Sequence, residues 1–183
     1  PLHPDLQVAL RKMGSGMTFI KHPFVNAHYL PQENLRFNRM LELLRDQADR
    51  MLRARRWRSY VFTHERPWRM YAFMNIMWRL GPKQYWQLLR SIWLDSENIH
   101  ENYDDWVELI TADVDYRWAL MDKDERVWIR QLPLDDDGLT TIYRGSPRRR
   151  ANEQLGLSWT MRPKAAIWFA NRYAFGSDRP TMI

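Results

Sequence analysis

Arginine, glycine and hydroxyl side chains near the C-terminal end of the sequence have the types and spacing to bind an anionic ligand. Arg144 and Gly145 follow a run of β-forming residues, and Ser158 and Thr160 occupy alternate positions of a second run. An arginine offers phosphate or ribose oxygens a planar fork of donors, and a neighbouring glycine lets the backbone approach closely. Residues two apart in a strand face the same side, so both hydroxyls are expected to reach one ligand or orient one catalytic group.

The elements that must position these residues are predicted as a β–loop–β–α series. Asp135 to Gly138 form a turn signal before a strand over 139–143, and a second strand follows over 155–160. Pro163 then opens a helix with a shared apolar face made by Ala165, Ala166, Phe169, Ala170 and Tyr173.

The preceding 133 residues are predicted to be mainly helical and rich in Trp and Met. Apolar residues at helical spacing from Phe37 to Leu52 predict an amphipathic helix. Gly81-Pro82 ends one helix and begins another. Further helices are expected over 4–13, 67–80, 103–111 and 122–131, with extended or loop structure over 17–33 and 57–63.

These patterns predict an α+β protein in which a mainly helical N-terminal region precedes a partial β–β–α unit. The period of the apolar residues changes after Pro133, so we place the domain boundary near 133–138. The helical region would then span 1–133 and the second domain 134–183.

The C-terminal series resembles ADP-ribosyltransferases of the arginine–serine–glutamate type. Arg144 matches the arginine that ends the first strand of their NAD cleft, Ser158-Trp159-Thr160 matches their Ser-x-Ser/Thr strand, and the segment from Ala165 to Ala170 matches the following helix. The matching segment covers about 30 residues. The whole chain is also similar to a group of phage and bacterial proteins of this type with a helical N-terminus, through His22-Pro23, His64-Glu65-Arg66-Pro67 and Asp95-Ser96-Glu97-Asn98.

The resemblance implies a role for each matched residue. Arg144 would contact the NAD phosphates or the nicotinamide-side ribose, and the backbone of Gly145 would hold the carboxamide. Ser158 would brace the cleft and the catalytic carboxylate, with support from Thr160. Tyr143, Trp159 or Trp168 would line the nicotinamide pocket, whereas Trp168 and Phe169 at such positions more often pack in a core. NAD would be the substrate, and no metal is expected.

The sequence departs from this family at the catalytic glutamate. That residue should follow the helix on a later strand, but Asp178 lies too close to the helix and Glu153 precedes the serine strand. The chain is therefore expected to be either an incomplete piece of a longer protein, which we favour, or a catalytically inactive relative.

Composition limits the remaining functions. The absence of Cys excludes disulfides and thiolate chemistry, and the 5 His are scattered without metal-ligand spacing. No apolar run approaches a membrane span of about 20 residues, and no signal peptide begins the sequence, so a soluble cytoplasmic protein is expected.

Two other functions compete with ADP-ribosyl transfer to a macromolecular acceptor, for which a protein is the first choice. A non-enzymatic helical module would bind or inhibit a host protein. Alternatively, the net charge of +6 and two arginine runs, Arg53-Ala-Arg-Arg-Trp-Arg58 and Arg148-Arg149-Arg150, would bind nucleic acid, although such runs are also typical of solvated faces.

Overall fold

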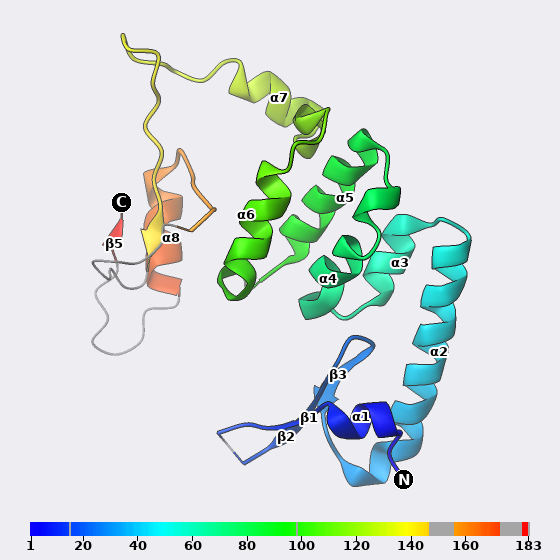
Figure 1. Cartoon of the computed structure of the whole chain (residues 1–183). Helices are drawn as coiled ribbons and strands as arrows, with labels where there is room; N and C mark the ends of the chain where they lie inside the picture. The colour runs from blue at the N-terminus through cyan, green and yellow to red at the C-terminus, as the bar shows by residue number, and fades with distance from the viewer. Residues whose placement is uncertain (15, 98, 147–155, 173–180, 183) are drawn as a thin grey trace. The chain divides into compact units, whose positions relative to one another are not determined.

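The computed structural model describes the whole chain except residues 15, 98, 147–155, 173–180 and 183 (Figure 1). It contains two compact units, each made of two stretches: Pro1–Asn98 with Asp113–Met121, and Ile99–Ala112 with Asp122–Ile183. Helices dominate and the sheets are small, which confirms the predicted α+β class with mainly helical content. The proposed boundary near 133–138 stays a prediction.

A three-stranded antiparallel sheet lies at the start of the first unit. Its strands, in spatial order, are β1 (Leu10–Lys12), β2 (Thr18–His22) and β3 (Val25–His28). The extended structure predicted within 17–33 is present in β2 and β3. The helix predicted over 4–13 is wrong in its second half, because α1 (Pro4–Val8) stops and Leu10 pairs with the buried Ile20 of β2.

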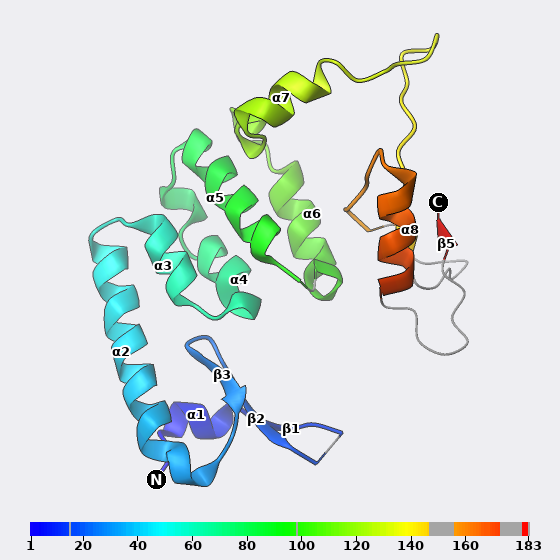
Figure 2. The same ribbon diagram turned by 180° about the vertical axis from the view of Figure 1, so that it is seen from behind.

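A small apolar core joins this sheet to the helices beside it. Leu6 from α1, Ile20 and Val25 from the sheet, and Phe37 and Leu41 from α2 (Asn34–Arg53) are all buried in one cluster. Figures 1 and 2 show α1 and α2 lying beside the sheet in both views. The helix predicted from the apolar spacing after Phe37 is confirmed, and the first part of its apolar stripe faces this core.

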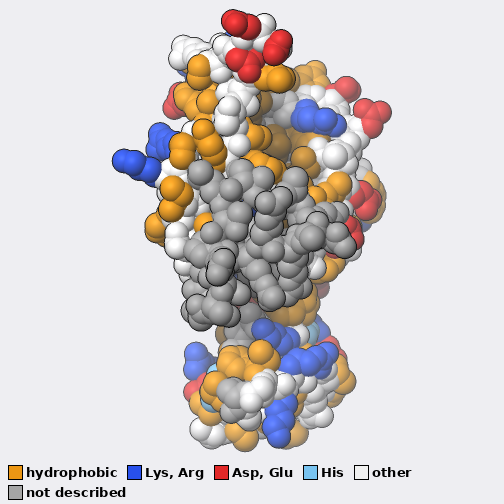
Figure 3. All heavy atoms as spheres, turned by 90° about the vertical axis from the view of Figure 1, so that its left-hand side faces the viewer, with side chains coloured by type: hydrophobic (Ala, Val, Ile, Leu, Met, Phe, Trp, Pro, Cys, Tyr) orange, Lys and Arg blue, Asp and Glu red, His pale blue; other side chains and the backbone are white. Residues whose placement is uncertain are grey.

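The turn of the β1–β2 hairpin leaves apolar side chains exposed among basic ones. Met13 and Met17 are exposed, and so are Arg11, Lys12 and Lys21 on the adjoining strands. Figure 3 shows Lys and Arg side chains gathered around hydrophobic ones on this face.

The rest of the first unit is a helical layer. After α2 come α3 (Trp57–Thr63), α4 (Arg69–Met74) and α5 (Pro82–Asp95), with 3₁₀ turns at Arg66–Trp68 and Met77–Arg79. The start of a helix at Pro82 is confirmed. The extended segment predicted over 57–63 is wrong, because packing of α3 against α2 and α4 overrides the β propensity of its aromatic and β-branched residues.

The continuous helix predicted over 67–80 is also wrong. α4 ends at Met74, and the N–H of the buried Ile76 bonds the carbonyl of Phe73 at 2.9 Å, three residues back. Such i→i−3 bonds tighten the chain into 3₁₀ geometry and end the α-helical ladder.

Trp86 fastens a distant segment of the chain to α5. Its indole is fully buried, and its Nε1–H donates to the carbonyl oxygens of Val114 at 3.2 Å and Asp115 at 2.8 Å. The guanidinium of Arg117 lies 5.5 Å from the centre of the same ring. These contacts hold the 3₁₀ turn Arg117–Leu120 against α5.

His64 is a buried titratable group that follows α3. Its ring lies 4.7 Å from that of Phe24 and 4.9 Å from that of Tyr60, and its Nδ1 lies 2.9 Å from the carbonyl oxygen of Tyr60. The neutral ring with a proton on Nδ1 satisfies this bond. Burial lowers the pKa of His64 below its ordinary value, and burial likewise lowers the pKa of His22.

We expect the protein to lose stability as the pH falls below about 6.5, the ordinary pKa of a histidine. The unfolded chain takes up a proton on His64 there, whereas the buried ring resists protonation until a lower pH. Above this range the group makes no contribution. Thermal unfolding followed between pH 8 and pH 5 should show the loss, and His64→Gln should reduce its slope. An unchanged slope in the variant would contradict the assignment.

The second unit contains three α-helices in its described ranges. These are α6 (Tyr103–Thr111), α7 (Lys123–Ile129) and α8 (Pro163–Arg172), and all three confirm predicted helices. Asp122 caps α7 in a reciprocal capping box with Glu125. In the parts of the helices that the structure describes, none is both long and apolar enough to cross a bilayer.

The strands of the second unit are shorter than predicted. Among the described residues of 139–143 and 155–160, pairing is limited to one antiparallel bridge between Tyr143 and Thr160. A two-stranded sheet instead pairs β4 (Gly145–Ser146) with β5 (Thr181–Met182). The turn before this region is confirmed, since the carboxylate of Asp135 accepts from the backbone N–H groups of Asp137 and Leu139.

Candidate functional site

Arg144 and Ser158, which the sequence places in one candidate site, are in contact. The bridge between Tyr143 and Thr160 is closed by backbone bonds of 2.6 and 2.8 Å, and it aligns the segments that precede and follow them. Nη1 of Arg144 then donates to the carbonyl oxygen of Ser158 at 2.8 Å. The contact therefore uses the backbone of Ser158, and its side chain is exposed.

Gly156 provides the space that the Arg144 guanidinium occupies. A methyl group at this position would overlap Nη2 of Arg144 and would lie 2.7 Å from Nη1. The guanidinium of Arg144 thus lies between the backbone of Gly156 and the carbonyl group of Ser158. The sequence does not predict this contact, because a glycine 12 residues after an arginine carries no local signal of it.

Gly145 lies against α8. A methyl group there would overlap the carbonyl oxygen of Ala166 and lie 2.6 Å from the amide nitrogen of Ala170. Ala166 and Ala170 are themselves buried, and their small side chains leave room for the β4 backbone. The glycine is required here for packing, and its implied contact with a nicotinamide carboxamide stays a prediction.

Thr160 has a local partner for its hydroxyl. Its Oγ1 accepts from the backbone N–H of Arg162 at 3.1 Å, immediately before α8 begins at Pro163. This bond shapes the entry into the helix. The Thr160 hydroxyl therefore helps to position the start of α8. Its implied support of a catalytic carboxylate stays a prediction. Glu153, Asp178 and the run Arg148-Arg149-Arg150 lie outside the described residues.

The aromatic residues of this region are exposed. Trp168 and Phe169 are 55% and 49% exposed, and Trp159 is 39% exposed. The two α8 rings contact one another edge to face at 4.8 Å, and Arg172 lies 5.1 Å from the centre of the Trp168 ring. The expectation that Trp168 and Phe169 pack in a core is wrong, because Ala166 and Ala170 take the buried positions of α8 instead.

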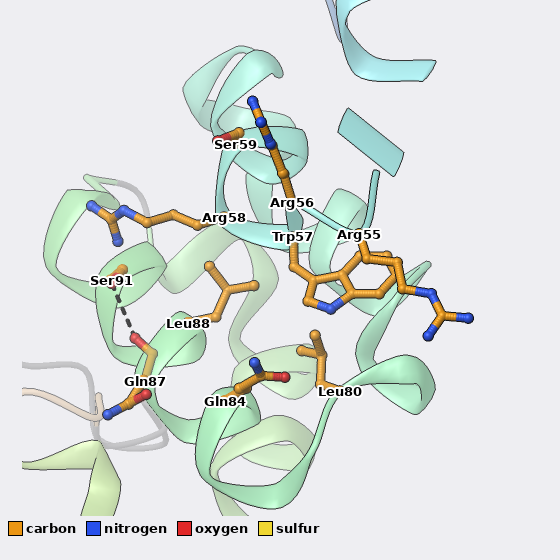
Figure 4. A pocket seen from close by; sticks show the side chains of 10 residues that line it. All are labelled: Arg55, Arg56, Trp57, Arg58, Ser59, Leu80, Gln84, Gln87, Leu88 and Ser91. Atoms are coloured by element: carbon orange, nitrogen blue, oxygen red, sulfur yellow. Dashed lines mark hydrogen bonds between the residues drawn. The ribbon is translucent and has the colours of Figure 1, made fainter. Parts of the chain in front are cut away.

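Two adjoining pockets of the first unit were not predicted as pockets, although their lining includes the arginine run 53–58 that the sequence offered as a nucleic-acid-binding segment. One, of about 330 Å³, lies between the α2–α3 turn and α5, and the other, of about 480 Å³, reaches the 3₁₀ turn Met77–Arg79. Both are lined by Arg55 and Trp57. Figure 4 shows Arg55 and Arg58 extending to opposite sides of the Trp57 indole, with Leu80 and Gln84 on one edge of it.

Arg55 adopts a backbone conformation that favours glycine. Its φ is +53°, and it occupies the position after the C-cap of α2 in a Schellman motif. The motif is closed by bonds from the N–H of Arg56 to the Met51 carbonyl at 2.9 Å and from the N–H of Arg55 to the Leu52 carbonyl at 3.2 Å. A side chain in this region costs about 1–2 kcal/mol relative to a right-handed conformation.

Comparisons of the chain with models of protein families, with curated proteins and with solved structures give no match. The function must therefore be inferred from the residues of this chain and the contacts that they make.

Proposed function

We propose that the second unit binds NAD⁺, and that the protein transfers ADP-ribose from it to a macromolecular acceptor or hydrolyses it. The observation that carries this proposal is the placement of the Arg144 guanidinium, bonded to the Ser158 carbonyl over the Gly156 backbone. This bond fixes the orientation of a planar group that carries five N–H donors in all. An oriented, half-buried fork suits the diphosphate of a dinucleotide.

In the proposed reaction the bond between nicotinamide and the C1′ atom of the ribose breaks, and nicotinamide leaves with the bonding electrons. The acceptor or water forms the new bond to C1′ and releases a proton. The ribose carries oxocarbenium character between these events, and a nearby carboxylate would stabilise it. In this reaction Arg144 binds and orients the substrate, while the resemblance assigns the carboxylate to a glutamate that the matched residues do not include.

We expect Arg144→Ala to abolish NAD⁺ binding measured by titration calorimetry. The charge-matched control is Lys164→Ala, which removes an exposed cation from the first turn of α8. The control should retain wild-type affinity. Loss of binding in the control and retention in Arg144→Ala would contradict the proposal, and so would absence of NAD⁺ binding by the wild-type chain.

Gly156→Ala offers a subtler test, because it displaces the fork without removing its charge. The new methyl group overlaps the end of the Arg144 side chain, which is flexible, so the cost in stability should stay within about 1 kcal/mol. We expect NAD⁺ affinity to fall at least tenfold while the thermal unfolding temperature changes little. Unchanged affinity would show that the observed position of the guanidinium does not matter for binding.

A second candidate function, recruitment of a protein partner without chemistry, is favoured by the exposed aromatic residues of α8. Large apolar side chains exposed together mark interaction surfaces more often than they mark ordinary surface. A complex with an acceptor protein that forms without NAD⁺ and is lost in Trp168→Ser would support this function. A complex that requires NAD⁺ would support the transferase instead.

A further inference from the structure

The two pockets beside the α2–α3 turn are lined by cations without any lining carboxylate. Arg55, Arg56 and Arg58 line the first, and Arg53, Arg55 and Arg79 line the second. The uncharged polar residues Ser59, Gln84, Gln87 and Ser91 complete the rim of the first pocket, and Trp57 contributes to both. We refer to these lining residues together as the Arg–Trp site.

The arginines of the Arg–Trp site differ in their partners from four other arginines of the same unit. Arg36, Arg45, Arg66 and Arg69 each pair with a carboxylate. Within the described ranges, no carboxylate forms a salt bridge with Arg53, Arg55, Arg56, Arg58 or Arg79. Five cations without acidic partners on one surface repel one another, and an anionic ligand would relieve that repulsion.

Aromatic rings lie among these cations. Trp57 is half-buried between the two pockets, and Trp78 is 71% exposed with the Arg79 guanidinium 4.5 Å from its ring centre. Arg58 lies 4.6 Å from the ring centre of Phe62. Exposed indole rings beside guanidinium groups form stacking surfaces for nucleobases, which have flat faces whatever their identity.

The strained conformation of Arg55 gives an independent indication of function. A glycine at this position would close the same Schellman motif without steric cost. The chain instead keeps a long cationic side chain there, at the one residue besides Trp57 that lines both pockets. Residues held in sparsely populated backbone conformations are found more often at ligand sites than elsewhere, and the pocket lining places Arg55 at such a site.

We propose that the Arg–Trp site binds single-stranded nucleic acid, with Trp57 stacking on a base and Arg55, Arg56 and Arg58 contacting phosphates. Two pockets that share residues can hold consecutive nucleotides, which favours a strand over a single nucleotide. The glutamine side chains of α5 offer donors and acceptors to base edges. Bases paired within a duplex are not free to stack on the indole, so the strand must be unpaired.

The direct test is fluorescence anisotropy of a labelled 12-nucleotide deoxythymidine strand titrated with the full chain. Binding should weaken with salt, and with three phosphate contacts the slope of log K against log[salt] should be about −2. A duplex of the same length should bind at least tenfold more weakly. Equal affinity for the duplex, or no binding at low salt, would overturn the proposal.

Arg55→Gly separates binding from folding. It removes the cation but relieves the backbone, so affinity should fall severalfold while the unfolding temperature rises by about 2–4 °C. The matched control is Arg39→Ala, because a glycine in the middle of α2 would itself destabilise the helix. Arg39 is also exposed, and it lies 14 residues before Arg53 on α2, about 21 Å along the helix. If binding falls equally in both variants, the affinity depends on the overall positive charge and not on the Arg–Trp site, and the proposal is overturned.

Two further variants test where on the protein the nucleic acid binds. Trp57→Leu retains apolar bulk, and loss of stacking should weaken binding on the order of tenfold. Replacement of Arg148, Arg149 and Arg150 by alanine should leave binding intact, which distinguishes the Arg–Trp site from the other arginine run. Full affinity in Trp57→Leu, loss of binding in the triple variant, or competition by polyglutamate as effective as that by unlabelled strand would each refute the assignment.

Discussion

Gly145→Ala is expected to separate β4 from α8 and to abolish NAD⁺ binding. The added methyl group would overlap the Ala166 carbonyl, and it would also lie too close to the Ala170 amide. Both groups belong to the helix backbone, so neither can rotate away as a side chain would. The cost should reach about 3 kcal/mol, the upper end of the range for overpacking, and it should fall on the second unit.

Hydrogen exchange can measure this effect locally. Amides of α8 should lose protection in Gly145→Ala, while those of α2 and α5 in the first unit should keep theirs. Gly14→Ala is the matched control, because a methyl group there meets no atom within 4 Å. Wild-type protection of α8 in Gly145→Ala would show that the contact between β4 and α8 is not formed as described.

Trp86→Ala should cause the largest loss of stability in the first unit, about 3–5 kcal/mol. The substitution opens a cavity where a fully buried indole lies, and it leaves the carbonyl oxygens of Val114 and Asp115 without the Nε1–H donor. Chemical unfolding monitored by circular dichroism measures the total. Leu94→Ala, an exposed position on the same helix, should change the free energy of unfolding by no more than about 0.5 kcal/mol.

Trp86→Phe separates the two contributions. It keeps most of the apolar volume and removes the donor, so the loss should be about 1–3 kcal/mol and should be accompanied by faster hydrogen exchange in residues 113–121. If Trp86→Phe were as stable as the wild type, the bonds to Val114 and Asp115 would contribute nothing, and the segment would be held by packing alone.

The parts of the fold that were predictable are those set by local periodicity. The spacing from Phe37 to Leu52 identifies α2, because apolar residues at this period share one side of a helix, and Gly81-Pro82 marks the start of α5. α3 was not predictable, since its aromatic and β-branched residues favour a strand until α2 and α4 pack against them. Local propensity is a weak guide wherever tertiary contacts bury a short element.

The candidate sites divide in the same way. The two β-forming runs suggest that Arg144 and Ser158 lie near one another, but the runs meet at a single bridge, and the contact uses the carbonyl of Ser158, which no residue type predicts. The space at Gly156 and the close approach of Gly145 to α8 depend on backbone separations that no spacing of residue types records. The Arg–Trp site forms because the chain changes direction at Arg55, between α2 and α3. The left-handed backbone conformation that allows this is typical of glycine, so an arginine at this position does not predict it.

The path of the chain through the two units has a practical consequence for limited proteolysis. The polypeptide passes between the units three times, at 98–99, 112–113 and 121–122. A single nick at the first crossing would yield two peptides, but the shorter one, 99–183, would still carry residues 113–121, which dock on Trp86 of the longer. The nicked protein should therefore migrate as one species in native gels and as two only under denaturing conditions, and a fragment meant to fold as the first unit must extend through Met121.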